Sequence, residues 1–93
     1  MNVLTNDNTK KVTVTNELGL HARPAALVAQ LALQAKSDIW LIKNDRQVDA
    51  SSIIDILTLE CKKGTELILR AVNNSDMAIV EKIATLFEKG FTE

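Results

Sequence analysis

Four short segments along the chain have the spacing and composition of β-strands. In residues 11–15, Val12 and Val14 alternate with polar neighbours, which is the pattern of a strand with one buried face. Three later segments are rich in β-forming residues: residues 37–43, 47–50 and 65–72. The turn residues "NDR" separate the first two of these, so the pattern predicts a hairpin there.

Apolar residues at helical spacing predict a first and a last helix. From Ala22 to about Lys36, small apolar residues recur at i, i+3, i+4 and i+7, and they form a face that allows close approach to a sheet. They are Ala25, Val28, Ala29 and Ala32. Residues 77–90 form the last amphipathic helix after the turn and N-cap "NNSD", and its buried face is made by Val80, Ile83 and Phe87.

A short helix is predicted between the third and fourth strands. It begins near Ser52, with Asp49, Ser51 or Ser52 as the capping residue, and Gly64 marks the exit turn. Ser52 and Asp55 fit the spacing of a capping box.

The resulting βαββαβα order predicts one α+β domain over residues 1–93. A chain of 93 residues holds a single core, so the elements should form a two-layer sandwich: a four-stranded antiparallel sheet with three helices on one face. One Trp, two Phe and no Tyr leave the core to aliphatic residues and alanine. Residues 1–9, which include the polar run "NDN", are expected to be loosely ordered.

Charge and cysteine content exclude several functional classes. Eleven basic residues nearly balance twelve acidic ones without long runs, so the sequence indicates neither a nucleic-acid binder nor a membrane-surface binder. Cys61 is the only cysteine, which rules out an internal disulfide and a cysteine-based metal cluster. No apolar run is long enough for a signal peptide or a membrane span, so we expect a cytoplasmic protein without membrane insertion.

The single histidine stands where the first helix begins. His21 is at the expected N-cap and Pro24 falls in the first turn, where its missing N–H costs nothing. The free N–H groups of Ala22 and Arg23, the helix dipole and the Arg23 guanidinium all favour an anion at this point. The same positive potential disfavours the protonated imidazole, so a neutral nitrogen is available to attack a phosphoryl group, which the same donors then stabilise.

Other interpretations of His21 follow from the residue types alone. The imidazole can be an exposed capping group and Arg23 a solvated side chain, although histidine is not a favoured N-cap. A metal site would need further histidine or cysteine ligands nearby. A Ser-His-Asp hydrolase would need an oriented base beside a nucleophile and a substrate pocket, and no phosphate-binding or dinucleotide-binding glycine pattern is present. We therefore expect neither a metal nor a cofactor.

The stretch "GLHARPA" resembles the histidine phosphocarrier family HPr of the bacterial phosphoenolpyruvate-dependent phosphotransferase system. The element order, "VDASSIIDILTL" and "KKGTELIL" extend the resemblance from about Lys10 to the last helix. It implies that His21 accepts a phosphoryl group on Nδ1 from phosphorylated enzyme I and passes it to an enzyme IIA protein or domain. Arg23 would stabilise the phosphate, and the backbone of Ala22 and Arg23 would bind it. The protein would be a monomeric carrier and a substrate of enzymes rather than an enzyme itself.

The resemblance also implies a regulatory site and a docking surface. Ser52 matches the position that an HPr kinase/phosphorylase modifies in some members, although Ser51 and Asp55 depart from the residues common there, and an N-cap role explains Ser52 as well. Partners would dock on Ala26, Leu27, Ile53 and Ile54, with one of the two isoleucines facing the core. Leu31, like Leu27, lies beside the buried helix face and is expected to be partly exposed.

Gln30 and Leu33 stand where well-known sugar-system carriers have lysines, which favours a specialised or nitrogen-type relay. Electrostatics govern partner selection and on-rate more than affinity, so a less basic docking face should change the choice of partner. A second hypothesis is a regulatory binding module, whose docking to a target is switched by phosphorylation of His21 or Ser52 without onward transfer. Transfer to an enzyme IIA acceptor discriminates the two.

Overall fold

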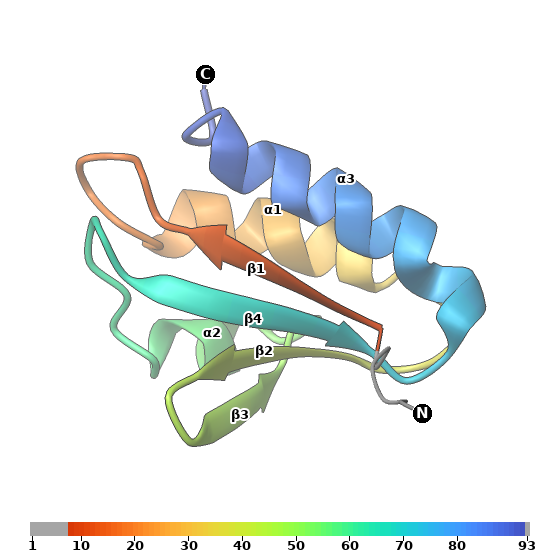
Figure 1. Cartoon of the computed structure of the whole chain (residues 1–93). Helices are drawn as coiled ribbons and strands as arrows, with labels where there is room; N and C mark the ends of the chain where they lie inside the picture. The colour runs from red at the N-terminus through yellow and green to blue at the C-terminus, as the bar shows by residue number, and fades with distance from the viewer. Residues whose placement is uncertain (1–7, 93) are drawn as a thin grey trace, which may run out of the picture.

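The computed structural model describes residues 8–92 and has the predicted βαββαβα order (Figure 1). The elements are β1 (Thr9–Thr13), α1 (Ala22–Ala32), β2 (Ile39–Lys43), β3 (Arg46–Asp49), α2 (Ile53–Leu57), β4 (Glu66–Ala71) and α3 (Met77–Glu88), with a turn of 3-10 helix, Asn74–Asp76, before α3. The predicted loose ordering of residues 1–9 concerns mostly residues 1–7, which lie outside the described part of the chain. Thr9 already belongs to β1.

The four strands form one antiparallel sheet in the order β1-β4-β2-β3. In Figure 1, α1 and α2 lie behind the strands and α3 runs beside α1. Helix α3 packs on β1 and β4, and α1 contacts both α3 and α2. This arrangement confirms the predicted α+β sandwich, in which one face of the sheet carries the helices.

Residues at the predicted periodicity fill the core between the sheet and the helices. Val12 and Val14 are buried, and so are alternate residues of β4. The buried faces of α1 and α3 include every residue predicted for them: Ala25, Val28, Ala29, Ala32, Val80, Ile83 and Phe87. The small residues of α1 allow this helix to pack closely against its neighbours.

Two helices end earlier than their patterns predicted. Helix α1 stops at Ala32 instead of Lys36, and α2 stops at Leu57, well before Gly64. The chain leaves α2 through Glu60, which has the left-handed conformation typical of helix ends (φ 53°). Cys61 therefore lies in the connection between α2 and β4.

The predicted turn and N-cap "NNSD" precedes α3, and its last residue, Asp76, is the N-cap residue by position. Asp76 makes no capping hydrogen bond in α3. Its two carboxylate oxygens instead accept hydrogen bonds from the backbone N–H groups of Lys36 and Ser37, each at 2.9 Å. A residue 40 positions away from Lys36 in sequence thus fixes the connection between α1 and β2.

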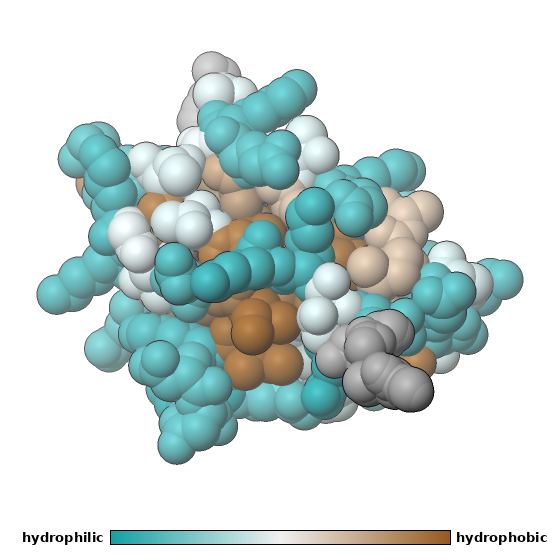
Figure 2. Space-filling model, viewed as in Figure 1, coloured by the Kyte–Doolittle hydropathy of each residue, from teal (hydrophilic) through white to brown (hydrophobic). Residues whose placement is uncertain are grey.

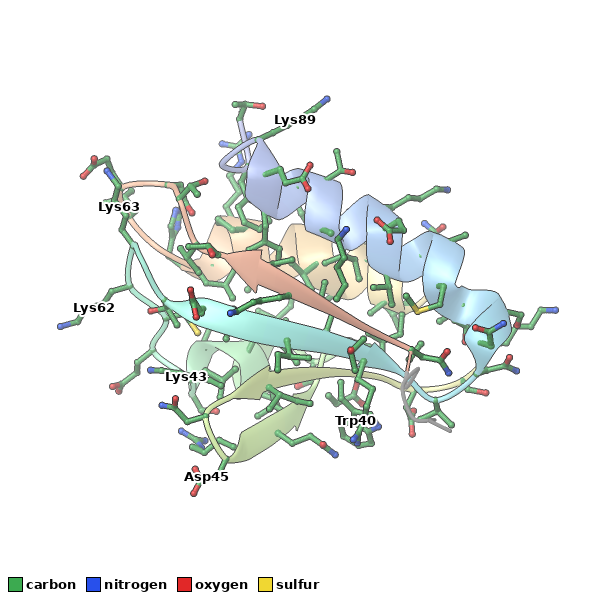
Figure 3. The ribbon with its side chains drawn as sticks, viewed as in Figure 1. Trp40, Lys43, Asp45, Lys62, Lys63 and Lys89 are labelled. Atoms are coloured by element: carbon green, nitrogen blue, oxygen red, sulfur yellow. The ribbon has the colours of Figure 1, made fainter. Side chains whose placement is uncertain are left out.

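The other face of the sheet is open to solvent. Trp40, labelled in Figure 3, is half-buried on β2 opposite Asp49 and Arg70 of the neighbouring strands. Figure 2 shows apolar surface over the middle of the sheet between charged side chains. Ile68 of β4 is among the exposed apolar residues. Between Asn8 and Thr92, every helix is too short or too polar to cross a lipid bilayer.

Candidate functional site

The loop from β1 to α1 is held by backbone contacts that place His21. Gly19 has a left-handed backbone (φ 73°), and a Cβ at this position would overlap the carbonyl oxygen of Cys61. That oxygen accepts a hydrogen bond from Leu20 N–H at 2.9 Å, and the Leu20 side chain is buried. The side-chain amide of Asn16 donates to the carbonyl of Gly19 at 2.6 Å. The loop is therefore anchored on both sides immediately before the histidine.

His21 is the N-cap residue of α1, as predicted, but its imidazole does not cap the helix. Its backbone is extended (φ −83°, ψ −168°), and its carbonyl accepts the first helical hydrogen bond from Ala25 N–H at 2.9 Å. The side chain makes no capping hydrogen bond and is half-exposed. Neither ring nitrogen therefore accepts a hydrogen bond from a backbone N–H of the helix, as the side chain of a favoured N-cap residue would.

The residues after His21 present donors to the same place. Ala22 and Arg23 are exposed and form the first two positions of α1, where a backbone N–H has no acceptor within the helix. Pro24 follows as the third helical residue and is buried. The helix start therefore offers two backbone donors and one guanidinium in a region of positive dipole potential, which suits a phosphoryl group.

Two depressions in the surface meet at His21. One has a volume of about 370 Å³ and is lined by Leu18, Leu20, His21, Leu57, Glu60, Cys61 and Lys62. The other has a volume of about 320 Å³ and is lined by Asn16, Glu17, Leu18, His21 and Arg23. Leu18 lines both depressions and is 78% exposed. A docking protein can therefore reach the imidazole from both sides.

Charged groups surround this surface. Lys62 and Lys63 project from the connection between α2 and β4, at the left edge of Figure 3. The amino group of Lys63 donates to Glu17 Oε2 at 2.6 Å, and this contact lowers the pKa of the Glu17 carboxyl below its ordinary value. Glu17 is consequently an ionised, paired group beside the second depression.

Cys61 lies at the first depression but is a poor nucleophile. The side chain is buried, and burial raises the pKa of its thiol above the ordinary value, with only partial opposition from the charge of Lys43. The thiolate form that reacts is therefore disfavoured. Within residues 8–92, no group of three or more metal-binding side chains comes together.

Ser52 caps α2, as one of the predicted interpretations requires. Its Oγ accepts a hydrogen bond from Asp55 N–H at 3.1 Å. The reciprocal half of a capping box is absent, because Ser52 N–H donates instead to the carbonyl of Asp49. Ser51 does not cap α2, because its hydroxyl donates to Asp49 Oδ1 at 2.7 Å.

The prediction that Ile53 and Ile54 point in opposite directions is wrong. Ile53 is 40% exposed and Ile54 is 74% exposed, because α2 has only five residues and buries a different side chain, Ile56. Ala26 and Leu27 are half-buried on α1, and Leu31 is half-buried too, as expected. Gln30 and Leu33 are exposed.

Sequence reasoning missed four residues that border His21. They are Leu18, Leu57, Glu60 and Lys62. Leu18 carried a usable signal, because it is a large apolar residue within the polar turn "NELG". The other three approach His21 only through the packing of the α2 region against α1.

Comparison with known proteins identifies close relatives. The family model described as "PTS HPr component phosphorylation site" matches residues 8–89. The phosphocarrier protein HPr of Treponema pallidum is 37% identical over 84 residues, covering 90% of this chain and 96% of the relative. The HPr-like protein Crh of Bacillus subtilis is 38% identical over 80 residues, covering 86% and 94%. The phosphocarrier protein NPr of Shewanella violacea is 31% identical over 84 residues, covering 90% and 92%.

Solved structures show the same fold. A crystal structure of HPr from Thermoanaerobacter tengcongensis superposes with a TM-score of 0.85 at 34% identity, covering 91% of this chain and 96% of that chain. A crystal structure of Bacillus subtilis Crh, described as a domain-swapped dimer, has a TM-score of 0.70 at 36% identity, covering 90% and 97%.

Proposed function

Because this chain belongs to the HPr family of phosphocarrier proteins of the phosphotransferase system, we propose that His21 accepts a phosphoryl group from phosphorylated enzyme I and donates it to an enzyme IIA protein or domain. Proteins of this family carry the group as substrates and are not catalytic enzymes. The observation that supports the specific role is the position of His21: its imidazole stands at a helix N-terminus without capping it. A side chain retained at this position for stability alone would be expected to cap the helix.

The proposed transfer moves one phosphoryl group between two nitrogen or oxygen nucleophiles. The lone pair of His21 Nδ1 attacks phosphorus, and the bond between phosphorus and the donor breaks with its electron pair left on the donor. The Arg23 guanidinium and the N–H groups of Ala22 and Arg23 balance the charge on the phosphoryl oxygens. The reverse exchange delivers the group to the acceptor and returns a neutral imidazole.

Incubation with phosphoenolpyruvate and enzyme I tests this role. We expect one phosphate per chain, labile in acid and stable in alkali, and no label in His21→Ala. His21→Asn is the matched control, because asparagine is a favoured N-cap and should keep the helix at least as stable while abolishing the label. Persistent label in either variant would exclude His21 as the acceptor.

The alternative is a regulatory binding module, and its support is the similarity to Crh, which is described as a catabolite repression protein. In that case a labelled protein binds a target but does not donate its phosphate. Addition of enzyme IIA separates the two functions: discharge of the label supports the carrier, and its retention by a target-bound protein supports the module.

We assign Ser52 to helix capping in preference to regulation by an HPr kinase/phosphorylase. A phosphate on Ser52 would lie near Asp55, which follows one turn later and would repel it. Incubation with ATP and such a kinase should therefore leave no acid-stable label, whereas a stoichiometric phosphoserine would overturn this assignment.

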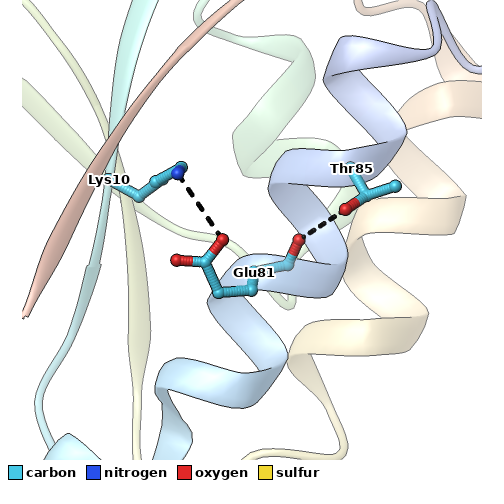
Figure 4. Close-up of polar contacts among 3 residues, drawn as sticks. All are labelled: Lys10, Glu81 and Thr85. Atoms are coloured by element: carbon cyan, nitrogen blue, oxygen red, sulfur yellow. Dashed lines mark hydrogen bonds and ion pairs between the residues drawn. The ribbon is translucent and has the colours of Figure 1, made fainter.

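We also propose a cytoplasmic monomer. Strand β1 pairs with β4 of its own chain over five residue pairs, and Lys10 of β1 lies 3.5 Å from Glu81 of α3 (Figure 4). Strand β1 therefore finds its pairing partners within its own chain. Light scattering should give the mass of one chain, and a stable dimer would contradict the proposal.

A further inference from the structure

Glu60 has a backbone conformation that its residue type does not favour. Four non-glycine residues between Asn8 and Thr92 have positive φ: Asn8, Asn44, Glu60 and Phe91. Asparagine tolerates this region. Phe91 is buried with its ring 4.9 Å from that of Phe87, so packing offsets the strain. Glu60 is not a residue type that tolerates this region, and its exposed side chain has no such packing to offset the strain.

The strained residue lies beside the proposed phosphoryl acceptor. Glu60 N–H donates to the carbonyl of Leu57 at 3.2 Å as the chain leaves α2, and its side chain lines the depression that contains His21. Glycine at this exit would relieve the strain but remove the carboxylate. An unfavourable backbone retained at a site is an indication of function.

The Glu60 carboxylate has no ion-pair partner in the described part of the chain. The amino group of Lys43 donates to backbone carbonyls instead, at 2.8 Å to Leu59 O and 3.4 Å to Glu60 O. Lys62 borders the same depression without pairing with Glu60. Among the described residues, the depression thus combines two exposed leucines, Leu18 and Leu57, with one unpaired charge of each sign.

We propose that Glu60 determines partner specificity by pairing with a lysine or arginine of the protein that exchanges phosphate with His21. This inference rests on the proposed function. A phosphoryl group on His21 adds nearly two negative charges close to Glu60, and like charges repel. A basic side chain from the partner, seated between them, attracts both and reduces their mutual repulsion, while an apolar neighbour covers Leu18 and Leu57. Partners that lack the cation are disfavoured by the uncompensated carboxylate.

Steady-state transfer from enzyme I and to enzyme IIA tests the proposal with Glu60→Gln, which keeps the side-chain shape. At low salt we expect KM for at least one partner to rise about three- to tenfold with kcat nearly unchanged, because a lost ion pair at a rim mainly slows association. In about 1 M salt, where the Debye length is about 3 Å, the difference should disappear. Asp38→Asn is the control: the same charge change beyond the far end of α1, roughly 16 Å of helix away, should leave KM unchanged.

Glu60→Gly separates the charge from the strain. We expect this variant to unfold at higher temperature than the wild type, because glycine favours the left-handed backbone, and yet to show the same increase in KM as Glu60→Gln. Unchanged KM values for both partners in Glu60→Gln, with the wild type fully labelled, would overturn the specificity role alone. Absence of label on the wild type would instead overturn the proposed function and this inference with it.

Discussion

At the level of single residues, Gly19 decides where the imidazole of His21 stands. The left-handed backbone of Gly19 turns the chain out of β1, and its missing side chain leaves room for the Cys61 carbonyl that accepts from Leu20. Glycine is required here for both conformation and space. The histidine two residues later is thereby tied to the connection between α2 and β4.

Gly19→Ala should lower the free energy of unfolding by more than about 1 kcal/mol, since alanine is strained at positive φ and its Cβ would overlap the Cys61 carbonyl. It should also slow labelling of His21, because the loop must move. Urea unfolding and the labelling rate measure the two effects. The matched control is Gly64→Ala, where φ is also positive (93°) but no heavy atom lies within 4 Å. Equal losses in the two variants would refute a role for the close approach.

At the level of elements, α2 is a short helix whose stability depends on the contacts at its two ends. It has five residues and one buried side chain, Ile56, so little packing supports it. Ser52 satisfies one of its free N–H groups, and Glu60 lies in the turn that follows the helix. Helices of this length are marginal without such contacts.

Ser52→Ala should therefore destabilise the protein by about 1 kcal/mol, the usual contribution of an N-cap. Ser51→Ala, which loses a hydroxyl contact to Asp49 but no cap, is the control and should lose less. Denaturant unfolding compares them. If Ser52 serves only as a cap, the phosphoryl-transfer rate of folded Ser52→Ala stays at the wild-type value; a changed rate would point to a further role.

At the level of the whole molecule, Asp76 joins distant parts of the chain. Its buried carboxylate holds the connection between α1 and β2 against the start of α3. Buried carboxylates are stabilising only when their oxygens are satisfied, and here each oxygen has a backbone donor.

Asp76→Asn should lower the free energy of unfolding by about 1–3 kcal/mol, because an amide NH₂ replaces one acceptor and leaves a backbone N–H without its partner. Glu81→Gln gives the comparison. It removes the exposed contact with Lys10 shown in Figure 4 and should change stability by less than about 0.5 kcal/mol. Similar losses in both variants would mean that the buried hydrogen bonds contribute little.

The periodicity of the chain was enough to predict the element order, the fold class and most of the core. Val12, Val14 and the alanine face of α1 are buried as predicted, because side-chain spacing follows directly from strand and helix geometry. The N-cap position of His21 and the capping role of Ser52 were also predictable, because caps are set by local backbone geometry.

The ends of α1 and α2, the exposure of Ile53, and the role of Asp76 were decided by tertiary contacts. The carboxylate of Asp76 would satisfy a local cap equally well, and only the position of residues 36 and 37 directs it elsewhere. Tertiary contacts also decided which residues surround His21. The sequence identified the histidine and its arginine, which lie two residues apart in the chain. Glu60 and Lys62 reach the depression at His21 only because the fold brings the exit of α2 against the loop that precedes α1.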